Sequence, residues 1–246
     1  MKKIAIIPAR YQSSRFPGKP LALINGKPMI QWVYENVSKA EALDSIYVAT
    51  DDVRIYDTVR SFDGKTLMTS VNHTCGTDRL AECAQILNLE DEDIVLNIQG
   101  DEPLVRAKMI DDLLSTVEND ISYMGTLKKK IEFEDEINNP NVVKVITDCN
   151  DDAIYFSRYP VPYIRNNSFV ELYKHVGAYA YKKWFLMRFC SMKKTKLECA
   201  ESLEQLRVIE NGYKIRVKET IWQTIGVDTP EQIKLVEEVL KSGIYG

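Results

Sequence analysis

Short apolar runs alternate with helix-like segments along the first part of the chain. The apolar runs carry β-branched and aliphatic side chains on both faces, as strands buried in a parallel sheet do; they span residues 4–7, 45–50, 65–69 and 93–99. The segments between them repeat apolar residues at helical spacing and begin at the helix-start signals Pro28, Asp51-Asp52 and Thr77. The alternation predicts an α/β fold with a doubly wound, mostly parallel sheet that binds ligands at the carboxyl ends of its strands.

The pattern loosens between about residues 122 and 190. Strand-like runs follow one another there with few helical stretches between them; they cover residues 123–127, 142–147, 153–156 and 173–181. We interpret this segment as a mixed-sheet insertion for a substrate lid and a dimer contact, within a single domain that spans residues 1–246. Beyond it, the pattern predicts a helix that stops at Gly212, a late strand and a final helix, over residues 198–211, 214–218 and 230–240.

The composition excludes several classes of protein to which the chain could belong. With 45% hydrophobic and 28% charged residues, the chain is neither disordered nor of low complexity. No stretch approaches the roughly 18–20 apolar residues of a membrane span, and the first apolar run is too short for a signal peptide. The five cysteines form no C-x-x-C pair and only two histidines are present, which disfavours a zinc enzyme. We expect a cytoplasmic protein that has no membrane partner.

The net charge of −4 argues against a nucleic-acid partner, so positive charge for an anionic ligand must be gathered locally. The loop after the first strand, residues 8–20, does so with Arg10, Arg15 and Lys19. Guanidinium and ammonium groups both suit a triphosphate. The loop is not a P-loop, because Pro20 rather than Ser or Thr follows Lys19. A solvated basic loop is an equally simple interpretation.

Two acidic strand ends complete the candidate chemistry. Asp101 follows the fourth strand, and Asp228 stands at a late strand-to-helix junction. A carboxylate that faces a triphosphate repels it unless a divalent cation lies between them, and Mg²⁺ prefers such oxygen ligands. Asp101 and Asp228 are therefore candidates to share one Mg²⁺. The alternative is that each aspartate only caps the helix that follows it.

These motifs carry a family resemblance, through segments that match in order over nearly the whole chain: residues 8–20, 48–52, 76–80, 99–103, 155–158, 174–177, 203–207 and 226–230. The chain resembles the 3-deoxy-manno-octulosonate cytidylyltransferases, which join CTP to an eight-carbon ulosonic acid. Their product is the CMP-sugar for bacterial lipopolysaccharide or capsule, and pyrophosphate is released. The resemblance implies a fold like that of the nucleotide-diphospho-sugar transferases, Mg²⁺ as cofactor, CTP and an ulosonic acid as partners, and a homodimer.

The resemblance also implies residue roles. Lys19, Asp101 and Arg10 would act in catalysis, and Asp101 and Asp228 would bind Mg²⁺. The residues implied for CTP are Pro8, Ala9, Arg10, Ser14, Arg15, Lys19, Cys75, Gly76 and Gln99. Those implied for the sugar acid are Arg79, Arg158, His175, Tyr179, Glu204 and Gln205, the arginines facing its carboxylate. Cys75 departs from the family pattern, in which a hydroxyl or amide side chain is more common.

Simpler interpretations of the sugar residues remain open. His175 and Tyr179 share one face of a strand and are equally well explained as a core pair. Arg79 and Arg158 are equally well explained as surface ion pairs. At the level of function, the alternatives are the same chemistry on another acid, such as an 8-amino octulosonate or a nonulosonate, and a non-catalytic nucleotide-binding module. A nucleotide-sugar glycosyltransferase is disfavoured because no D-x-D motif occurs at this strand end.

Overall fold

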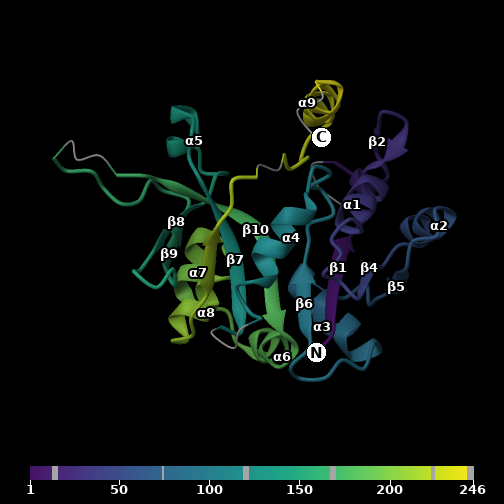
Figure 1. The fold of residues 1–246 in the computed structure, drawn as a ribbon, viewed down its shortest axis with the longest axis horizontal. Coiled ribbons are helices and arrows are strands. Elements are labelled where there is room, and N and C mark those ends of the chain that lie inside the picture. The colour runs from purple at the N-terminus through teal and green to yellow at the C-terminus, as the bar shows by residue number, and fades with distance from the viewer. Residues whose placement is uncertain (13–15, 74, 119–121, 167–169, 223–224, 243–246) are drawn as a thin grey trace.

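A single long sheet runs through the molecule in the strand order β11-β7-β10-β6-β1-β4-β5 (Figure 1). The computed structural model describes residues 1–12, 16–73, 75–118, 122–166, 170–222 and 225–242. The strands of this order are β1 (Lys3–Ala9), β4 (Ser45–Thr50), β5 (Thr66–Met68), β6 (Ile94–Asn97), β7 (Met124–Lys130), β10 (Tyr173–Lys182) and β11 (Arg216–Glu219). Within this order of described strands, the pairings of β10 with β6 and β7 are antiparallel and the other four are parallel. The predicted mostly parallel sheet is confirmed.

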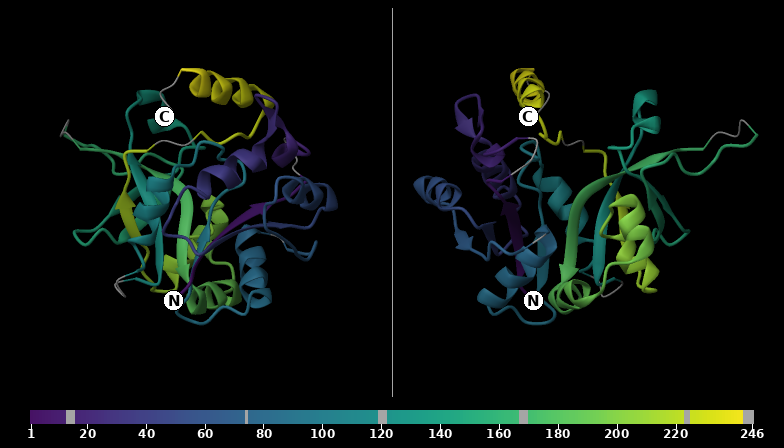
Figure 2. Two further views of the ribbon diagram at one scale, coloured as in Figure 1. Left: turned by 45° about the vertical axis from the view of Figure 1, so that its right-hand side comes forward. Right: turned by 180° about the vertical axis from the view of Figure 1, so that it is seen from behind.

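Helices cover both faces of the sheet (Figure 2). One face packs against α1 (Met29–Val37), α2 (Val53–Ser61) and α4 (Ala107–Leu114), and the other against α3 (Gly76–Ile86), α6 (Lys183–Ser191) and α8 (Leu206–Glu210). Alternate residues of β1 enter the two cores: Ala5 and Ile7 the first, Ile4 and Ile6 the second. A strand buried on both faces has to be continuously apolar. The doubly wound arrangement is therefore confirmed.

Two predicted helix features are wrong in detail. Helix α3 is capped by Cys75, whose sulfur accepts a hydrogen bond from the Asp78 amide, so Thr77 lies inside the helix. The helix predicted over 198–211 is two short helices, α7 (Lys196–Glu201) and α8. Ser202 separates them because it adopts a left-handed backbone with φ of 53°. Gly212, at φ of 78°, does end α8 as predicted.

The segment from residue 122 to 190 contributes both to the sheet and to its margin. Strands β7 and β10 lie inside the central sheet, and β8 (Lys144–Thr147) and β9 (Ala153–Ser157) extend it from β10. The short helix α5 (Glu134–Asn138) and helix α6 were not predicted. The described residues between β9 and β10, 158–166 and 170–172, project away from the body of the molecule (Figure 1).

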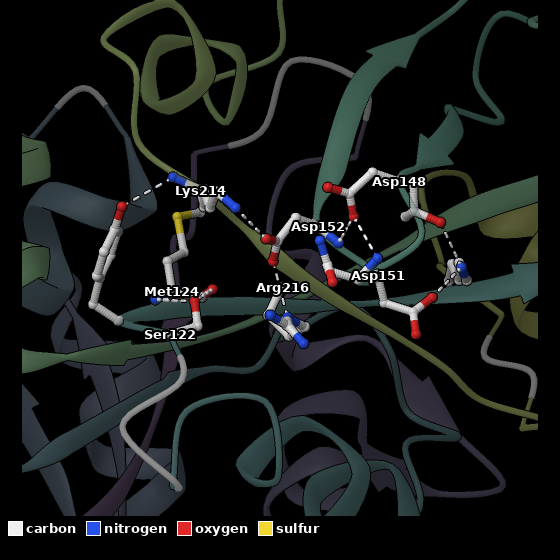
Figure 3. A network of polar contacts seen from close by, with 11 residues as sticks. Ser122, Met124, Asp148, Asp151, Asp152, Lys214 and Arg216 are labelled. Atoms are coloured by element: carbon white, nitrogen blue, oxygen red, sulfur yellow. Dashed lines mark hydrogen bonds and ion pairs between the residues drawn. The ribbon is translucent and has the colours of Figure 1, made fainter.

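A polar network ties this margin to strand β11 (Figure 3). Asp152, at the start of β9, accepts hydrogen bonds from Lys214 Nζ and Arg216 Nε, both at 2.9 Å. Asp148 holds the preceding turn, because its carboxylate accepts from the Asp152 amide at 2.9 Å. The ion pairs fix the β8–β9 hairpin against the sheet edge.

The C-terminal helix α9 (Pro230–Lys241) folds back over the N-terminal hairpin of β2 (Leu23–Ile24) and β3 (Lys27–Pro28). Ile24 and Met29 form a small core there with Val227 and Val236. Between β1 and β2, the 3-10 helix η1 (Lys19–Leu21) follows Gly18. This packing brings the segment before α9 above the first loop of the chain. None of the described helices combines the length and apolarity needed to cross a membrane.

Candidate active site

A cavity of ≈ 390 Å³ opens at the carboxyl ends of β1 and β6. It is lined by Pro8, Ala9, Arg10, Gln12, Lys19, Pro20, Gln99, Gly100, Asp101 and Asp228. The two strand ends approach closely, since a side chain on Gly100 would place its Cβ 2.9 Å from the Pro8 carbonyl oxygen. The predicted nucleotide and metal residues among these therefore meet at one place. Ser14 and Arg15, also expected here, lie outside the described residues.

Lys19 lies between Asp101, which follows β6, and Asp228, which precedes α9; the strand expected directly before Asp228 is absent from the described residues, because β11 ends at Glu219. Its Nζ is 2.6 Å from Asp101 Oδ2 and 3.1 Å from Asp228 Oδ1. The ammonium is largely enclosed, whereas both carboxylates remain open to solvent on one side. One cation thus faces two anions at the rim of the cavity, and the three groups together carry a net charge of −1.

Neither aspartate caps the helix that follows it. Thr229 and Gln232 form the capping box of α9, and the Gln232 side chain accepts a hydrogen bond from the Asp228 amide at 2.6 Å. Helix α4 begins after Arg106, well beyond Asp101. The Val227 amide donates to the Asp101 carbonyl at 2.9 Å, which ties the segment before α9 to the loop after β6. Both carboxylates are therefore left to face the cavity.

The two carboxylates fit a Mg²⁺ site. Mg²⁺ is usually held by one or two carboxylates and completes its shell with water and substrate phosphates. Asp101 and Asp228 both reach the Lys19 ammonium within 3.1 Å, so they are near enough to face one cation. Among the described residues, no group of three or more His, Cys, Asp or Glu side chains forms a complete metal site. Two carboxylate ligands suit a metal ion whose remaining ligands are supplied by a substrate and by water.

Arg10 lines the first cavity next to β1 and is joined to the segment before α3, whose described residues do not line this cavity themselves. Arg10 Nη2 donates to the His73 carbonyl at 2.8 Å. Gly76 packs near the Pro8 ring, where an added Cβ would lie 3.6 Å from Pro8 Cγ. Burial raises the pKa of the Cys75 thiol to about 11, so this side chain is protonated at neutral pH. A protonated thiol is a poor nucleophile.

A second cavity of ≈ 250 Å³ shares Gln99 with the first. Its other lining residues are Gly76, Thr77, Asn97, Met124, Tyr179, Tyr181, Phe189, Ser202, Leu203, Glu204 and Gln205. Because the chain breaks between α7 and α8, both Glu204 and Gln205 line this cavity. Glu204 Oε2 accepts a hydrogen bond from Thr77 Oγ1 at 2.9 Å. Burial, and then the charge of Glu204, raise the pKa of Tyr179 well above its ordinary value. Its phenol stays a hydrogen-bond donor.

Arg158 does not line this cavity, contrary to expectation. Its Nε donates to the Glu201 carbonyl at 2.6 Å, and Nη1 donates to the Pro140 carbonyl at 2.9 Å. Nη2 reaches the Ser202 carbonyl at 3.4 Å. The guanidinium thus supports the backbone at the α7–α8 break, because the carbonyls at the end of α7 need donors.

Arg79 is also placed away from both cavities. Its side chain is 0% exposed, and Nη2 lies 2.7 Å from Asp51 Oδ2. Nη1 donates to the Thr69 hydroxyl. A guanidinium enclosed in this way has no surface to offer a ligand. In this structure Arg79 anchors the ends of β4 and β5 to α3, and it does not face a sugar carboxylate as predicted.

His175 contacts Tyr179 but faces a different space. The two rings lie on one strand face with centroids 5.3 Å apart, as the residue spacing predicted. His175 lines a third cavity, of ≈ 860 Å³, which meets the first at Asp228 and also includes Gly177 and Glu102. The expected sugar residues are therefore divided between adjoining spaces.

The Thr126 hydroxyl determines which ring nitrogen of His175 carries the hydrogen. Thr126 Oγ1 lies 2.7 Å from the Ala178 carbonyl and 2.9 Å from His175 Nε2. The hydroxyl has one hydrogen, and the carbonyl can only accept it. Thr126 therefore donates to Ala178 and accepts from Nε2–H of His175. Burial lowers the pKa of His175 to about 3, so the ring is neutral and its Nδ1 is an acceptor.

Thr126 and Asn97 were not singled out from the sequence. Asn97 is the last residue of β6, after a run of apolar residues, and is itself buried. A polar residue at the carboxyl end of a buried strand was the available signal. Thr126 carried no comparable signal, because its role depends on an irregular pairing of β10 with β7 between Val176 and Tyr179.

Comparison with known proteins agrees with this architecture. The cytidylyltransferase family model matches residues 4–218. The 3-deoxy-manno-octulosonate cytidylyltransferase of Thermodesulfovibrio yellowstonii is 48% identical, over 98% of this chain and 99% of the relative. That of Fusobacterium nucleatum is 51% identical, over 98% of each chain. The 8-amino-3,8-dideoxy-manno-octulosonate cytidylyltransferase of Shewanella pealeana is 50% identical, over 96% of this chain and 98% of the relative.

Solved structures extend the comparison to three dimensions. The structure of CMP:2-keto-3-deoxy-manno-octonic acid synthetase complexed with CTP superposes with a TM-score of 0.92 at 41% identity, over 98% of this chain and 99% of that chain. A 4-diphosphocytidyl-2C-methyl-D-erythritol synthase shares the fold alone, at 13% identity and a TM-score of 0.67 over 98% and 100% of the two chains. The chain therefore belongs to the 3-deoxy-manno-octulosonate cytidylyltransferase family.

Proposed function

We propose that this enzyme transfers CMP from CTP to 3-deoxy-manno-octulosonate and releases pyrophosphate, with Mg²⁺ held by Asp101 and Asp228. The observation that carries the proposal is the Lys19 ammonium between these two carboxylates, at the rim of a cavity on the ends of β1 and β6. Ligands of open α/β sheets bind at such strand ends. The family membership supplies the substrates.

The proposed reaction is attack of the sugar 2-hydroxyl on the α-phosphorus of CTP. Both reactants are anions, and a pair of like charges at about 4 Å costs roughly 4 kcal/mol at an effective dielectric near 20. Positioning and charge neutralisation therefore supply most of the rate. When bound, Mg²⁺ would add positive charge at the phosphates and polarise them.

Different residues of this chain would position the reactants and neutralise their charge. Arg10 and Lys19 carry the cationic charge of the first cavity, and Lys19 is placed to stabilise charge that develops at the α-phosphate. Gln99 borders both cavities, so it lies where nucleotide and sugar meet. Pro8 lines the first cavity and would face the cytosine, and Gly76, which packs beside the Pro8 ring, lines the second cavity. No side chain is assigned as general base.

The second cavity is the proposed sugar site. Glu204, Gln205 and Tyr179 line it and offer acceptors and donors for hydroxyl groups. The cavity is joined to the first through Gln99, so a sugar held there is within reach of a nucleotide in the first cavity.

The test is pyrophosphate release from CTP with a panel of sugar acids and a titration of Mg²⁺. We expect release with 3-deoxy-manno-octulosonate that depends on Mg²⁺. Release with none of the acids would refute the proposed transfer. The second candidate substrate is 8-amino-3,8-dideoxy-manno-octulosonate, because the Shewanella pealeana relative with that name is 50% identical. A higher kcat/KM for the amino sugar than for the hydroxyl sugar would favour it.

A homodimer is part of the proposal. Between β9 and β10 the projecting segment exposes Tyr159 and Tyr163, which are 76% and 86% accessible, and also Ile164 and Val170. Exposed apolar side chains on one projection mark an interaction surface. We propose that a second copy covers it and that this segment also acts as the substrate lid. Sedimentation should show a dimer for the native chain and a monomer for Tyr159→Ser/Tyr163→Ser; a native monomer would refute the dimer.

We place the reaction in the cytoplasm, in the synthesis of a bacterial surface polysaccharide. All five cysteines are free in the structure, as is usual for proteins of a reducing compartment. Fractionation of cells that express the chain tests this location, and recovery of the protein outside the cytoplasmic fraction would contradict it.

A further inference from the structure

Asn97 occupies the floor of the second cavity. It ends β6 and lies in register with Ile6 of β1 on one side and with Tyr179 of β10 on the other. Only 5% of the residue is exposed, yet it lines the cavity beside Tyr179, Tyr181 and Met124. A buried polar side chain therefore stands in a cavity whose walls combine aromatic and apolar residues with polar ones.

The side-chain oxygen of Asn97 has no protein partner within the described part of the chain. Its Oδ1 is buried and accepts no hydrogen bond. Buried polar atoms in native proteins are nearly always paired, and an unpaired one lowers stability. Asn36 shows the usual case: it is 3% exposed, its Nδ2 donates to the Pro103 carbonyl at 2.8 Å, and its Oδ1 accepts from Lys39 Nζ at 2.7 Å.

The chemistry of the cavity selects the ligand group. A carboxamide offers an acceptor and two donors without net charge. Glu204 lines the same space, so a carboxylate or phosphate placed there would meet a like charge. Hydroxyl groups both donate and accept, and they pair with Oδ1 and with the Glu204 carboxylate alike. The cavity, at ≈ 250 Å³, is large enough for several hydroxyl-bearing carbons.

We propose that the Asn97 side chain binds hydroxyl groups of the sugar acid and thereby orients its polyol chain toward the nucleotide. This inference rests on the proposed function, because it takes the sugar acid as the occupant of the second cavity. The unpaired amide is retained at a cost in stability, and the ligand satisfies it. Sites that trade stability for binding in this way are common in enzymes.

The test compares Asn97→Leu with Asn36→Leu, a matched change at the paired asparagine. Without ligand, Asn97→Leu should raise the melting temperature by about 2–4 °C, whereas Asn36→Leu should lower it. The KM for the sugar acid should rise at least tenfold in Asn97→Leu and stay within about twofold in Asn36→Leu. The KM for CTP should stay within about twofold in both. If the leucine at position 97 prevents folding, Asn97→Ala gives the same KM comparison.

Any one of three results would overturn the inference. The first is a melting temperature that Asn97→Leu lowers, as Asn36→Leu does. The others are a KM for the sugar acid that is unchanged in Asn97→Leu, or a KM for CTP that rises in its place. The thermal comparison requires no turnover. It therefore decides whether the amide is unpaired even if the native enzyme accepts a different acid or none. A native enzyme without pyrophosphate release would refute the proposed function, and the thermal shift produced by polyhydroxy acids in native and Asn97→Leu protein would still test the ligand.

Discussion

Lys19 Nζ and Asp101 Oδ2 lie 2.6 Å apart although 82 residues separate them in the chain. The pair exists because β1 and β6 are adjacent parallel strands whose loops leave the sheet at the same edge. In the absence of a ligand the ammonium is neutralised by the two carboxylates that would hold the metal. We expect bound phosphates to pair with the ammonium and bound Mg²⁺ to pair with the carboxylates, so that each group would still face an opposite charge.

The first prediction concerns Lys19. Lys19→Ala should fold normally and lower kcat by about 10²–10³-fold, the scale of losing one preorganised donor. Pyrophosphate release measures it. Lys27→Ala is the control, because Lys27 is a nearby cation that pairs with Glu35 and does not line the cavity. An equal kcat in Lys19→Ala and Lys27→Ala would show that Lys19 has no role in catalysis.

The second prediction concerns the metal. Asp101→Asn and Asp228→Asn should each abolish turnover at Mg²⁺ concentrations that saturate the native enzyme, because an amide replaces a charged ligand. Initial rates across a Mg²⁺ titration measure this. The exposed Glu41 provides the control, and Glu41→Gln should follow the native curve. An unchanged titration in either aspartate variant would contradict the shared site.

The third prediction concerns pH. Because burial lowers the pKa of His175 from 6.5 to about 3, the unfolded chain binds a proton at a higher pH than the folded chain does. The free energy of unfolding should therefore fall as pH drops from about 6.5 toward 3. His175→Gln should lose this part of the fall, since it does not titrate. Urea unfolding midpoints between pH 7.5 and 4 measure it, with His73→Gln as the control that retains the His175 contribution.

The fourth prediction concerns the Arg79–Asp51 ion pair. Asp51→Asn should lower the free energy of unfolding by about 3 kcal/mol, because it leaves a fully buried guanidinium without its counter-charge. Asp111→Asn breaks an ion pair that is 74% and 42% exposed and should change stability by less than about 1 kcal/mol. Urea unfolding measures both. If Asp51→Asn left the free energy of unfolding unchanged and raised the KM for the sugar acid, Arg79 would act in sugar binding and not as a structural anchor.

Much of the fold follows from the local pattern. The strands of the first half were predicted nearly at their observed positions because they are continuously apolar. The helix predicted over residues 198–211 failed at Ser202, whose left-handed backbone leaves no mark in the apolar periodicity. That break is what delivers Glu204 and Gln205 to the second cavity. Local periodicity describes which residues prefer a helix, and tertiary contacts decide where it breaks.

The sequence alone determined the kinds of chemistry and the order in which they occur: a cationic loop after one strand and an acidic residue after two others. These are local properties, set by residue type and by the alternation of strand and helix. Only the tertiary structure decided which charges meet. It placed Lys19 between Asp101 and Asp228 and gave Arg79 and Arg158 structural partners. It also left the side-chain oxygen of Asn97 without a partner among the residues that the structure describes. Such meetings depend on strand order, register and packing between distant segments, which no local pattern contains.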